Sequence, residues 1–119
     1  MYTISKQFHF SASHCLVGVP PDHPCARLHG HNYVVELELR SKQLNAAGFV
    51  RDYLELRELK LYLEEQLDHR HINDVLGDEY ASAERLAHWL FDWCAERWPE
   101  TCAVRVSETP KTWAEYRPA

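Results

Sequence analysis

Three histidines and a cysteine in the first part of the chain are spaced in a way that suits metal or acid–base chemistry. His29 and His31 lie two residues apart in C-A-R-L-H-G-H (25–31), and His14 ends the earlier segment F-S-A-S-H. Residues two apart on a β-strand point to the same face, so His29 and His31 would project together toward the apolar side of a sheet. Three imidazoles that meet at one point suit a zinc ion with an open fourth position, the arrangement of a catalytic rather than a structural site.

Each of these residues also has a plainer interpretation. The histidines could be polar strand residues without a ligand, and a β-bulge before His14 would turn its side chain to the other face. Cys25 lies in a proline-containing loop, where it is either an exposed reactive thiol or a bystander. Cys15 follows His14 directly and would point to the opposite face, so a packing role is expected for it.

Two further polar groups fall at the ends of predicted elements. Glu108 shares the parity of Val104 and Val106, so a carboxylate continues an apolar strand face; it either reaches solvent there or accepts hydrogen bonds from a ligand. A carboxylate can bind the paired N–H and NH2 groups of an aminopyrimidine ring, such as guanine or pterin, in bidentate fashion. Asp68 precedes His69 at a helix end, where an aspartate can orient an imidazole for acid–base work.

The elements that must hold these residues follow the order ββααββ. The two-residue alternation of half-buried strands is found in four segments: 2–11, 29–40, 102–108 and 113–117. Asp52 is the predicted N-cap of a helix that begins near Tyr53, and Ser82 is the predicted N-cap of a second helix. We therefore expect one α+β domain over residues 1–119, with an antiparallel sheet and two helices on one face.

The composition is that of a globular protein, and it argues against several classes of function. The chain has 119 residues, 45% of them apolar, and its net charge of −5 argues against general nucleic-acid binding. There is no apolar run of about 18 residues and no apolar signal core, so no membrane contact and a cytoplasmic location are expected. Cys94 and Cys102 fall in a helical and a strand pattern, and both are expected to be small core residues rather than disulfide partners.

Five fragments taken together resemble the 6-pyruvoyl-tetrahydropterin synthase / 6-carboxytetrahydropterin synthase family. In chain order they are F-S-A-S-H, C-A-R-L-H-G-H-N-Y, L-D-H-R-H-I-N-D, S-A-E-R-L-A and V-S-E-T. The resemblance implies the tunnelling fold, in which ββααββ subunits join their sheets into an oligomeric barrel. It also implies a homo-oligomer, a hexamer or similar, with sites between subunits. By the same resemblance His14, His29 and His31 are ligands of a Zn²⁺ cofactor.

The resemblance also implies roles for the other candidates. Cys25 matches the catalytic thiol, Asp68 and His69 match its relay partners, and Glu108 matches a catalytic residue that anchors the pterin. The short spacing between Cys25 and His29 is similar to that of the bacterial 6-carboxytetrahydropterin synthases of queuosine biosynthesis. The implied enzyme is a zinc-dependent carbon–oxygen/carbon–carbon lyase. It would convert 7,8-dihydroneopterin triphosphate to 6-carboxy-5,6,7,8-tetrahydropterin, with release of acetaldehyde and triphosphate.

Two alternatives to this reaction stay open. One is the 6-pyruvoyl-tetrahydropterin synthase reaction, which releases triphosphate only; the other is a non-catalytic, zinc-containing pterin-binding module. Cys25 together with Asp68 and His69 argues against the module, because a binding protein needs neither. His71 is interpreted as a surface residue, at a position where the family often has an aromatic side chain. The cations that could meet the triphosphate resemble other surface cations; they are Arg27, Arg51 and Lys111.

Overall fold

The fold is built around one long β-hairpin. In the computed structural model, which describes all 119 residues, β1 (Tyr2–His14) and β2 (His29–Ser41) pair antiparallel over their whole length, and His14 lies opposite His29. Each strand has 13 residues and so spans about 43 Å at roughly 3.3 Å per residue. The hairpin therefore accounts for most of the longest dimension of the molecule, which is 55 Å.

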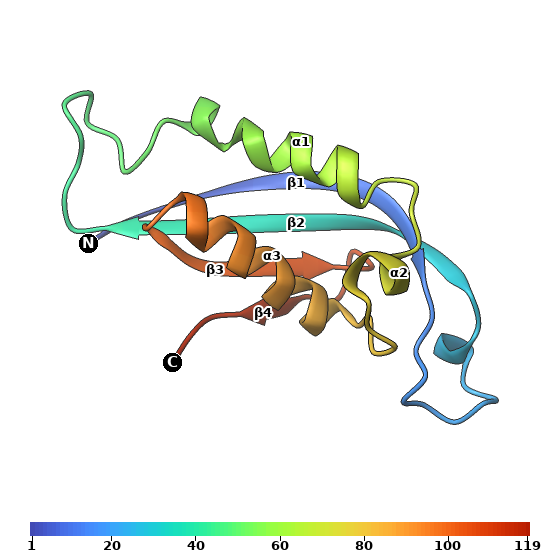
Figure 1. The fold of residues 1–119 in the computed structure, drawn as a ribbon. Helices are drawn as coiled ribbons and strands as arrows, with labels where there is room; N and C mark the ends of the chain where they lie inside the picture. The colour runs from blue at the N-terminus through green and yellow to red at the C-terminus, as the bar shows by residue number, and fades with distance from the viewer.

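The remaining elements complete the sheet and cover one of its faces (Figure 1). β3 (Thr101–Ser107) pairs antiparallel with β2, and β4 (Ala114–Tyr116) pairs antiparallel with β3, which gives the strand order β1-β2-β3-β4. The helical elements are η1 (Pro24–Ala26), η2 (Tyr53–Leu56), α1 (Arg57–Gln66), α2 (Ile72–Leu76) and α3 (Ala83–Arg97). None of these helices combines the length and the apolar character that a membrane crossing requires.

The core lies between the sheet and the two long helices. It is a cluster of 22 buried apolar residues that includes Phe8 and Val35 from the strands, Leu63 from α1 and Leu90 from α3. Cys94, which was expected in the core, is buried among them. The predicted α+β architecture, with an antiparallel sheet and helices on one face, is confirmed.

Side-chain caps start both helical segments as predicted. The Asp52 carboxylate accepts a hydrogen bond from the Leu54 N–H at 2.9 Å, and the Ser82 hydroxyl accepts one from the Arg85 N–H at 3.2 Å. The first segment opens with the 3-10 turn η2 before α1 begins. The sequence pattern did not predict α2, because a helix of five residues is too short to show a helical period. This helix ends at Gly77, whose φ of 63° is left-handed.

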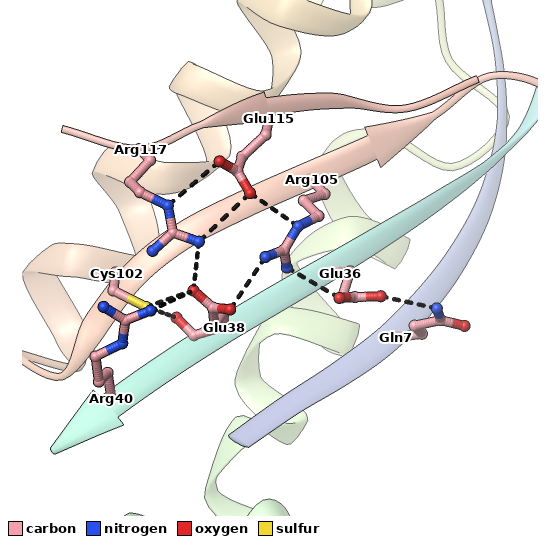
Figure 2. A network of polar contacts seen from close by, with 8 residues as sticks. All are labelled: Gln7, Glu36, Glu38, Arg40, Cys102, Arg105, Glu115 and Arg117. Atoms are coloured by element: carbon pink, nitrogen blue, oxygen red, sulfur yellow. Dashed lines mark hydrogen bonds and ion pairs between the residues drawn. The ribbon is translucent and has the colours of Figure 1, made fainter. Parts of the chain in front are cut away.

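The opposite face of the sheet carries a network of charged groups (Figure 2). Glu38 accepts hydrogen bonds from Arg105 at 3.0 Å, from Arg117 at 2.6 Å and from the Cys102 thiol at 2.9 Å. Burial acts to raise the pKa of Glu38, but these hydrogen bonds outweigh it and hold the pKa at about 2.

Cys102 was expected in the core, and that prediction is wrong. A register shift between Glu38 and Leu39, where β2 meets β3, interrupts the alternation and directs the thiol to this charged face.

Candidate active site

The three predicted metal ligands lie together at the loop end of the β1–β2 hairpin. His14 and His29 form the last residue pair, and His31 lies two residues further along β2 on the same face. The ring centroids are 4.5 Å apart for His14 and His29, 4.9 Å for His29 and His31, and 5.1 Å for His14 and His31. One ring nitrogen of each lies within 4.8 Å of the other two. Strand parity brings these side chains together because no register shift interrupts the β1–β2 pairing.

Backbone carbonyls hold two of the three rings with one nitrogen facing the centre. His14 Nδ1 lies 2.7 Å from the Ala81 carbonyl oxygen, and His29 Nδ1 lies 2.7 Å from the Arg27 carbonyl oxygen. A carbonyl accepts only, so each Nδ1 carries the proton and each Nε2 keeps its lone pair. Nε2 of His14 and Nε2 of His31 are buried and form no hydrogen bond of regular geometry, although the Glu108 carboxylate lies near both. Ring nitrogens oriented in this way are typical of metal ligands.

Electrostatics favours the neutral, metal-binding form of His31. Burial lowers the pKa of His31; the Glu108 carboxylate opposes this effect, and the neighbouring His14 and His29 add to it. A histidine must be unprotonated at the nitrogen that binds a metal. Three neutral imidazole nitrogens form a donor set that suits zinc, with a fourth position for another ligand. The residues present therefore fit a bound metal ion, and their role as ligands stays a prediction.

Glu108 lies beside this cluster, directly after β3. Its Oε2 is 3.0 Å from His31 Nε2 and 3.6 Å from His14 Nε2, and its side chain is 24% exposed. The carboxylate is thus directed at the histidines instead of simply ending in solvent. Tyr33, which the sequence did not single out, packs its ring against His31 at 5.5 Å. Burial, helped by Glu108, raises the pKa of Tyr33, and its buried hydroxyl has no partner.

Asp68 and His69 are held on the free edge of β1. The His69 N–H donates to the Ser11 carbonyl at 2.6 Å, and Asp68 Oδ1 accepts the Ser11 N–H at 2.9 Å. Asp68 Oδ2 lies 2.9 Å from His69 Nδ1. The Ser11 N–H, followed by His69, lowers the pKa of Asp68, which keeps this carboxylate ionised. The carboxylate therefore orients the imidazole, as the dipeptide suggested.

His69 has an unusual backbone and an exposed side chain. Its φ of 59° is the one left-handed value at a non-glycine residue of the chain, a conformation that costs on the order of 1 kcal/mol or more. Its side chain is 83% exposed. His69 and His31 line one open cavity of about 480 Å³ together with Ser11, Asn32 and other polar residues. Thus the predicted relay histidine and a predicted metal ligand border the same space.

Cys25 is not brought to the other candidates within one chain. It lies in η1, where its N–H donates to His23 Nδ1 at 3.0 Å and its carbonyl accepts the Leu16 N–H at 2.8 Å. The Cys25 side chain is partly exposed, and its sulfur takes part in none of the hydrogen bonds of the chain. It does not line the cavity that contains His69. The backbone of the loop is anchored, but the thiol has no partner.

Two residues near the site were missed by sequence reasoning. The Asn73 side chain accepts the Cys15 N–H at 3.0 Å and donates to the Cys15 carbonyl at 2.8 Å, which fixes the chain directly after His14. His71 was interpreted as a surface residue, but its Nδ1 lies 3.0 Å from Ser13 Oγ and it lines the same cavity as His69. The sequence motif that contains both residues gives no sign of these contacts, because they are made with Ser13 in β1 and with Cys15 directly after it, 58 residues away in sequence.

The structure also separates the cations that were considered for the triphosphate. Arg51 is bound at 2.7 Å to Glu55 and at 2.8 Å to Glu100, and its side chain is only 24% exposed. Two carboxylates therefore already compensate its charge, so the suggestion that it meets the triphosphate is withdrawn. Arg27 and Lys111 are exposed, and neither is among the residues in ion pairs.

The structure is that of an α+β protein in which three histidines, with Glu108 beside them, cluster at one end of the sheet. Solved structures share this fold. The 6-pyruvoyl tetrahydropterin synthase of Caenorhabditis elegans superposes with a TM-score of 0.86 at 23% identity, and the match covers 99% of this chain and 96% of that chain. At that identity the likeness concerns the fold.

Sequence comparison gives the family. Residues 3–119 match the 6-pyruvoyl tetrahydropterin synthase family, and the chain belongs to it. A 6-carboxy-5,6,7,8-tetrahydropterin synthase of Synechocystis sp. is 35% identical over 124 residues, which is 98% of this chain and 93% of the relative. The 6-pyruvoyl tetrahydrobiopterin synthase of Poecilia reticulata is 35% identical over 98 residues, 75% of this chain and 65% of the relative. The chain is thus a member of an enzyme family of pterin chemistry.

Proposed function

We propose that this chain is a zinc-dependent lyase that converts 7,8-dihydroneopterin triphosphate to 6-carboxy-5,6,7,8-tetrahydropterin in queuosine biosynthesis, with release of acetaldehyde and triphosphate. The observation that carries the proposal is the group of three imidazoles, each with one ring nitrogen within 4.8 Å of the other two, beside the Glu108 carboxylate. The near-full-length match to the Synechocystis enzyme supports the 6-carboxy reaction. The short spacing between Cys25 and His29 supports it as well.

His14, His29 and His31 would hold the zinc ion. When bound there, zinc supplies Lewis-acid chemistry to oxygen atoms of the substrate side chain. The carbonyl oxygens of Ala81 and Arg27 keep two of the rings oriented before any metal arrives, because each accepts the Nδ1 proton. The protein therefore needs little rearrangement of these two rings to bind the ion.

The other candidate residues would position the substrate and transfer protons. Glu108 accepts hydrogen bonds from the N–H and NH2 groups of the pterin ring, and this places the substrate side chain at the histidines. Cys25, as a thiolate, removes a proton from a carbon of the side chain. His69, oriented by Asp68, relays protons to and from that thiol. These roles follow the family resemblance and stay predictions for this chain.

A homo-oligomer would complete the site. The Cys25 thiol has no partner within the chain, and His69, which Asp68 orients, borders a cavity open to solvent. The sheet also has an unpaired edge along most of β1 and another at β4, and open edges favour pairing between copies. We infer that Cys25 of one copy faces the Asp68–His69 pair of another, within a barrel of joined sheets.

Mixed oligomers test this arrangement. Cys25→Ala and His69→Ala should each retain zinc and fold but lose turnover, since each lacks one member of the relay. Unfolding and refolding the two variants together should restore up to about a quarter of wild-type activity, because that share of randomly formed interfaces pairs an intact thiol with an intact histidine. A mixture as inactive as its parents would place the thiol and the histidine in the same chain or remove one from the mechanism.

The 6-pyruvoyl reaction is the second candidate, and the match to the Poecilia enzyme favours it. The zinc-loaded protein is incubated with 7,8-dihydroneopterin triphosphate, the pterin products are identified by mass spectrometry, and acetaldehyde is assayed separately. Acetaldehyde together with 6-carboxytetrahydropterin is the expected result. Triphosphate release without acetaldehyde would identify the 6-pyruvoyl reaction, and binding without any turnover would refute both.

A further inference from the structure

A second cavity adjoins the metal-ligand cluster on the side of Glu108. Its volume is about 420 Å³, and its lining includes Glu108, Val106, Ala114, Glu84 and Trp113. Glu108 links the cavity to the histidines, because it lines the cavity and its Oε2 lies 3.0 Å from His31 Nε2; the lining extends to Ala114 at the start of β4. A space of this size falls in the range of sites for small organic ligands.

Trp113 differs from the other tryptophans of the chain. Its side chain is 48% exposed, whereas Trp98 is buried and Trp89 and Trp93 stack on Tyr62. Trp113 forms no aromatic pair within the chain, so one large apolar surface at the mouth of the cavity has no partner. Isolated exposed apolar residues are common, but this one borders a cavity that also contains a candidate ligand-binding carboxylate.

A hydrogen-bonded turn fixes the position of Trp113. The Thr112 N–H donates to the Thr109 carbonyl at 3.3 Å, and the hydroxyls of the two threonines are 3.0 Å apart. On the other side, Ala114 pairs with Val106 at the end of the β3–β4 ladder. The backbone on both sides of Trp113 is thus held, by a closed turn and by a strand, a few residues after Glu108. This backbone needs little additional ordering when a ligand binds.

The groups that line the cavity select a particular kind of ligand. The carboxylates of Glu108 and Glu84 accept hydrogen bonds and repel anions, so this space suits a ring with N–H donors rather than a triphosphate. Val106 and Ala114 give an apolar wall, and an indole offers a flat face on which a heteroaromatic ring can stack. A fused aminopyrimidine ring has both properties: a flat π-system and an N–H/NH2 edge.

We propose that Trp113 is the stacking platform for the substrate ring, whose N–H/NH2 edge is bound by Glu108. This inference rests on the proposed function, because it takes Glu108 as the residue that anchors the ring. Trp113 then contributes to affinity and to selection of bicyclic rings, and it has no part in proton transfer. The predicted relay residues, Cys25, Asp68 and His69, are not among the residues that line this cavity.

Binding of neopterin, which has the ring but no triphosphate, tests the platform. Isothermal titration of the zinc-loaded protein should show that Trp113→Ala weakens neopterin binding about 10- to 100-fold, the usual effect of removing one stacked aromatic. Trp113→Phe should keep most of the affinity, because a phenyl ring also stacks. Tyr53→Ala is the matched control, since Tyr53 is 50% exposed and does not line the cavity. Zinc content should stay the same in all of these variants.

A second measurement reports on contact directly. Neopterin should quench the fluorescence of the exposed tryptophan in the wild-type protein, and this quenching should disappear in Trp113→Phe. If Trp113→Ala binds neopterin within about twofold of the wild type while Glu108→Gln has lost binding, the platform is wrong and the proposed function stands. If the wild type itself binds no neopterin and Glu108→Gln changes nothing, both the proposed function and this inference fail.

Discussion

Zinc added to the metal-free protein should raise the temperature at which the chain unfolds. Nε2 of His14 is buried without a hydrogen-bond partner, and such an atom costs about 1–3 kcal/mol in the metal-free state. Zinc at roughly 100 times its Kd contributes about 2.7 kcal/mol of stability. For a chain of 119 residues, an unfolding entropy of about 2.1 cal/mol/K per residue converts this into a rise of about 11 °C.

One ligand variant and one control make this prediction specific. His29→Ala removes a predicted ligand, so its melting temperature should rise by less than about 3 °C under the same conditions. His9→Ala should respond like the wild type, because His9 is exposed and lies outside the cluster although it is on the same strand as His14. The assay is differential scanning calorimetry at fixed protein concentration, with zinc in one arm and a chelator in the other.

Two results would refute the assignment of the metal centre. The first is a wild-type melting temperature that zinc leaves unchanged although the protein is folded. The second is a His29→Ala variant that responds to zinc as strongly as the wild type, since the ion would then be bound elsewhere. Metal analysis of the same samples, with one zinc per chain expected for the wild type, distinguishes a displaced site from a missing one.

Two other substitutions test the framework around the site. Glu38→Gln should reduce the dependence of unfolding free energy on pH. Glu38 has a pKa of about 2 against an ordinary 4.5, so its contribution is full above pH 4.5 and is lost as the pH falls toward 2. Urea unfolding across this range should show a loss smaller by up to about 3 kcal/mol than in the wild type, and an unchanged pH profile, or an equal effect of the exposed-site control Glu64→Gln, would contradict this. Asn73→Ala should cost about 1–3 kcal/mol of stability, because it removes both partners of the Cys15 backbone; a loss no larger than that of Asp74→Ala would show that the amide is dispensable.

Much of the fold could be predicted because the signals are local. Alternation gives the strands, and the caps at Asp52 and Ser82 depend on residues two or three positions away. The convergence of His14, His29 and His31 also follows from alternation, since the hairpin pairs the two strands without a shift. Local sequence patterns were therefore enough to predict that the three histidines lie together.

The rest depends on contacts between segments far apart in the sequence. Cys102 was placed on the wrong face because the register shift that moves it involves β2, which alternation within β3 cannot reveal. His71 contacts Ser13 in β1, Asn73 contacts Cys15 directly after β1, and Arg51 is bound to Glu100, 49 residues away. Each of these interactions is decided by tertiary packing, and one sequence contains no direct signal for it.

The charged network on the helix-free side limits what can lie against this sheet. An apolar layer placed over Glu38, Arg105 and Arg117 would remove the water that hydrates these charged groups. Their mutual attraction would not offset the free energy of this desolvation. The sheet therefore has only one apolar face, the face that the helices cover. Any ring formed by joining such sheets edge to edge, with the helices outside, would enclose a hydrated bore through which water and small ions can exchange.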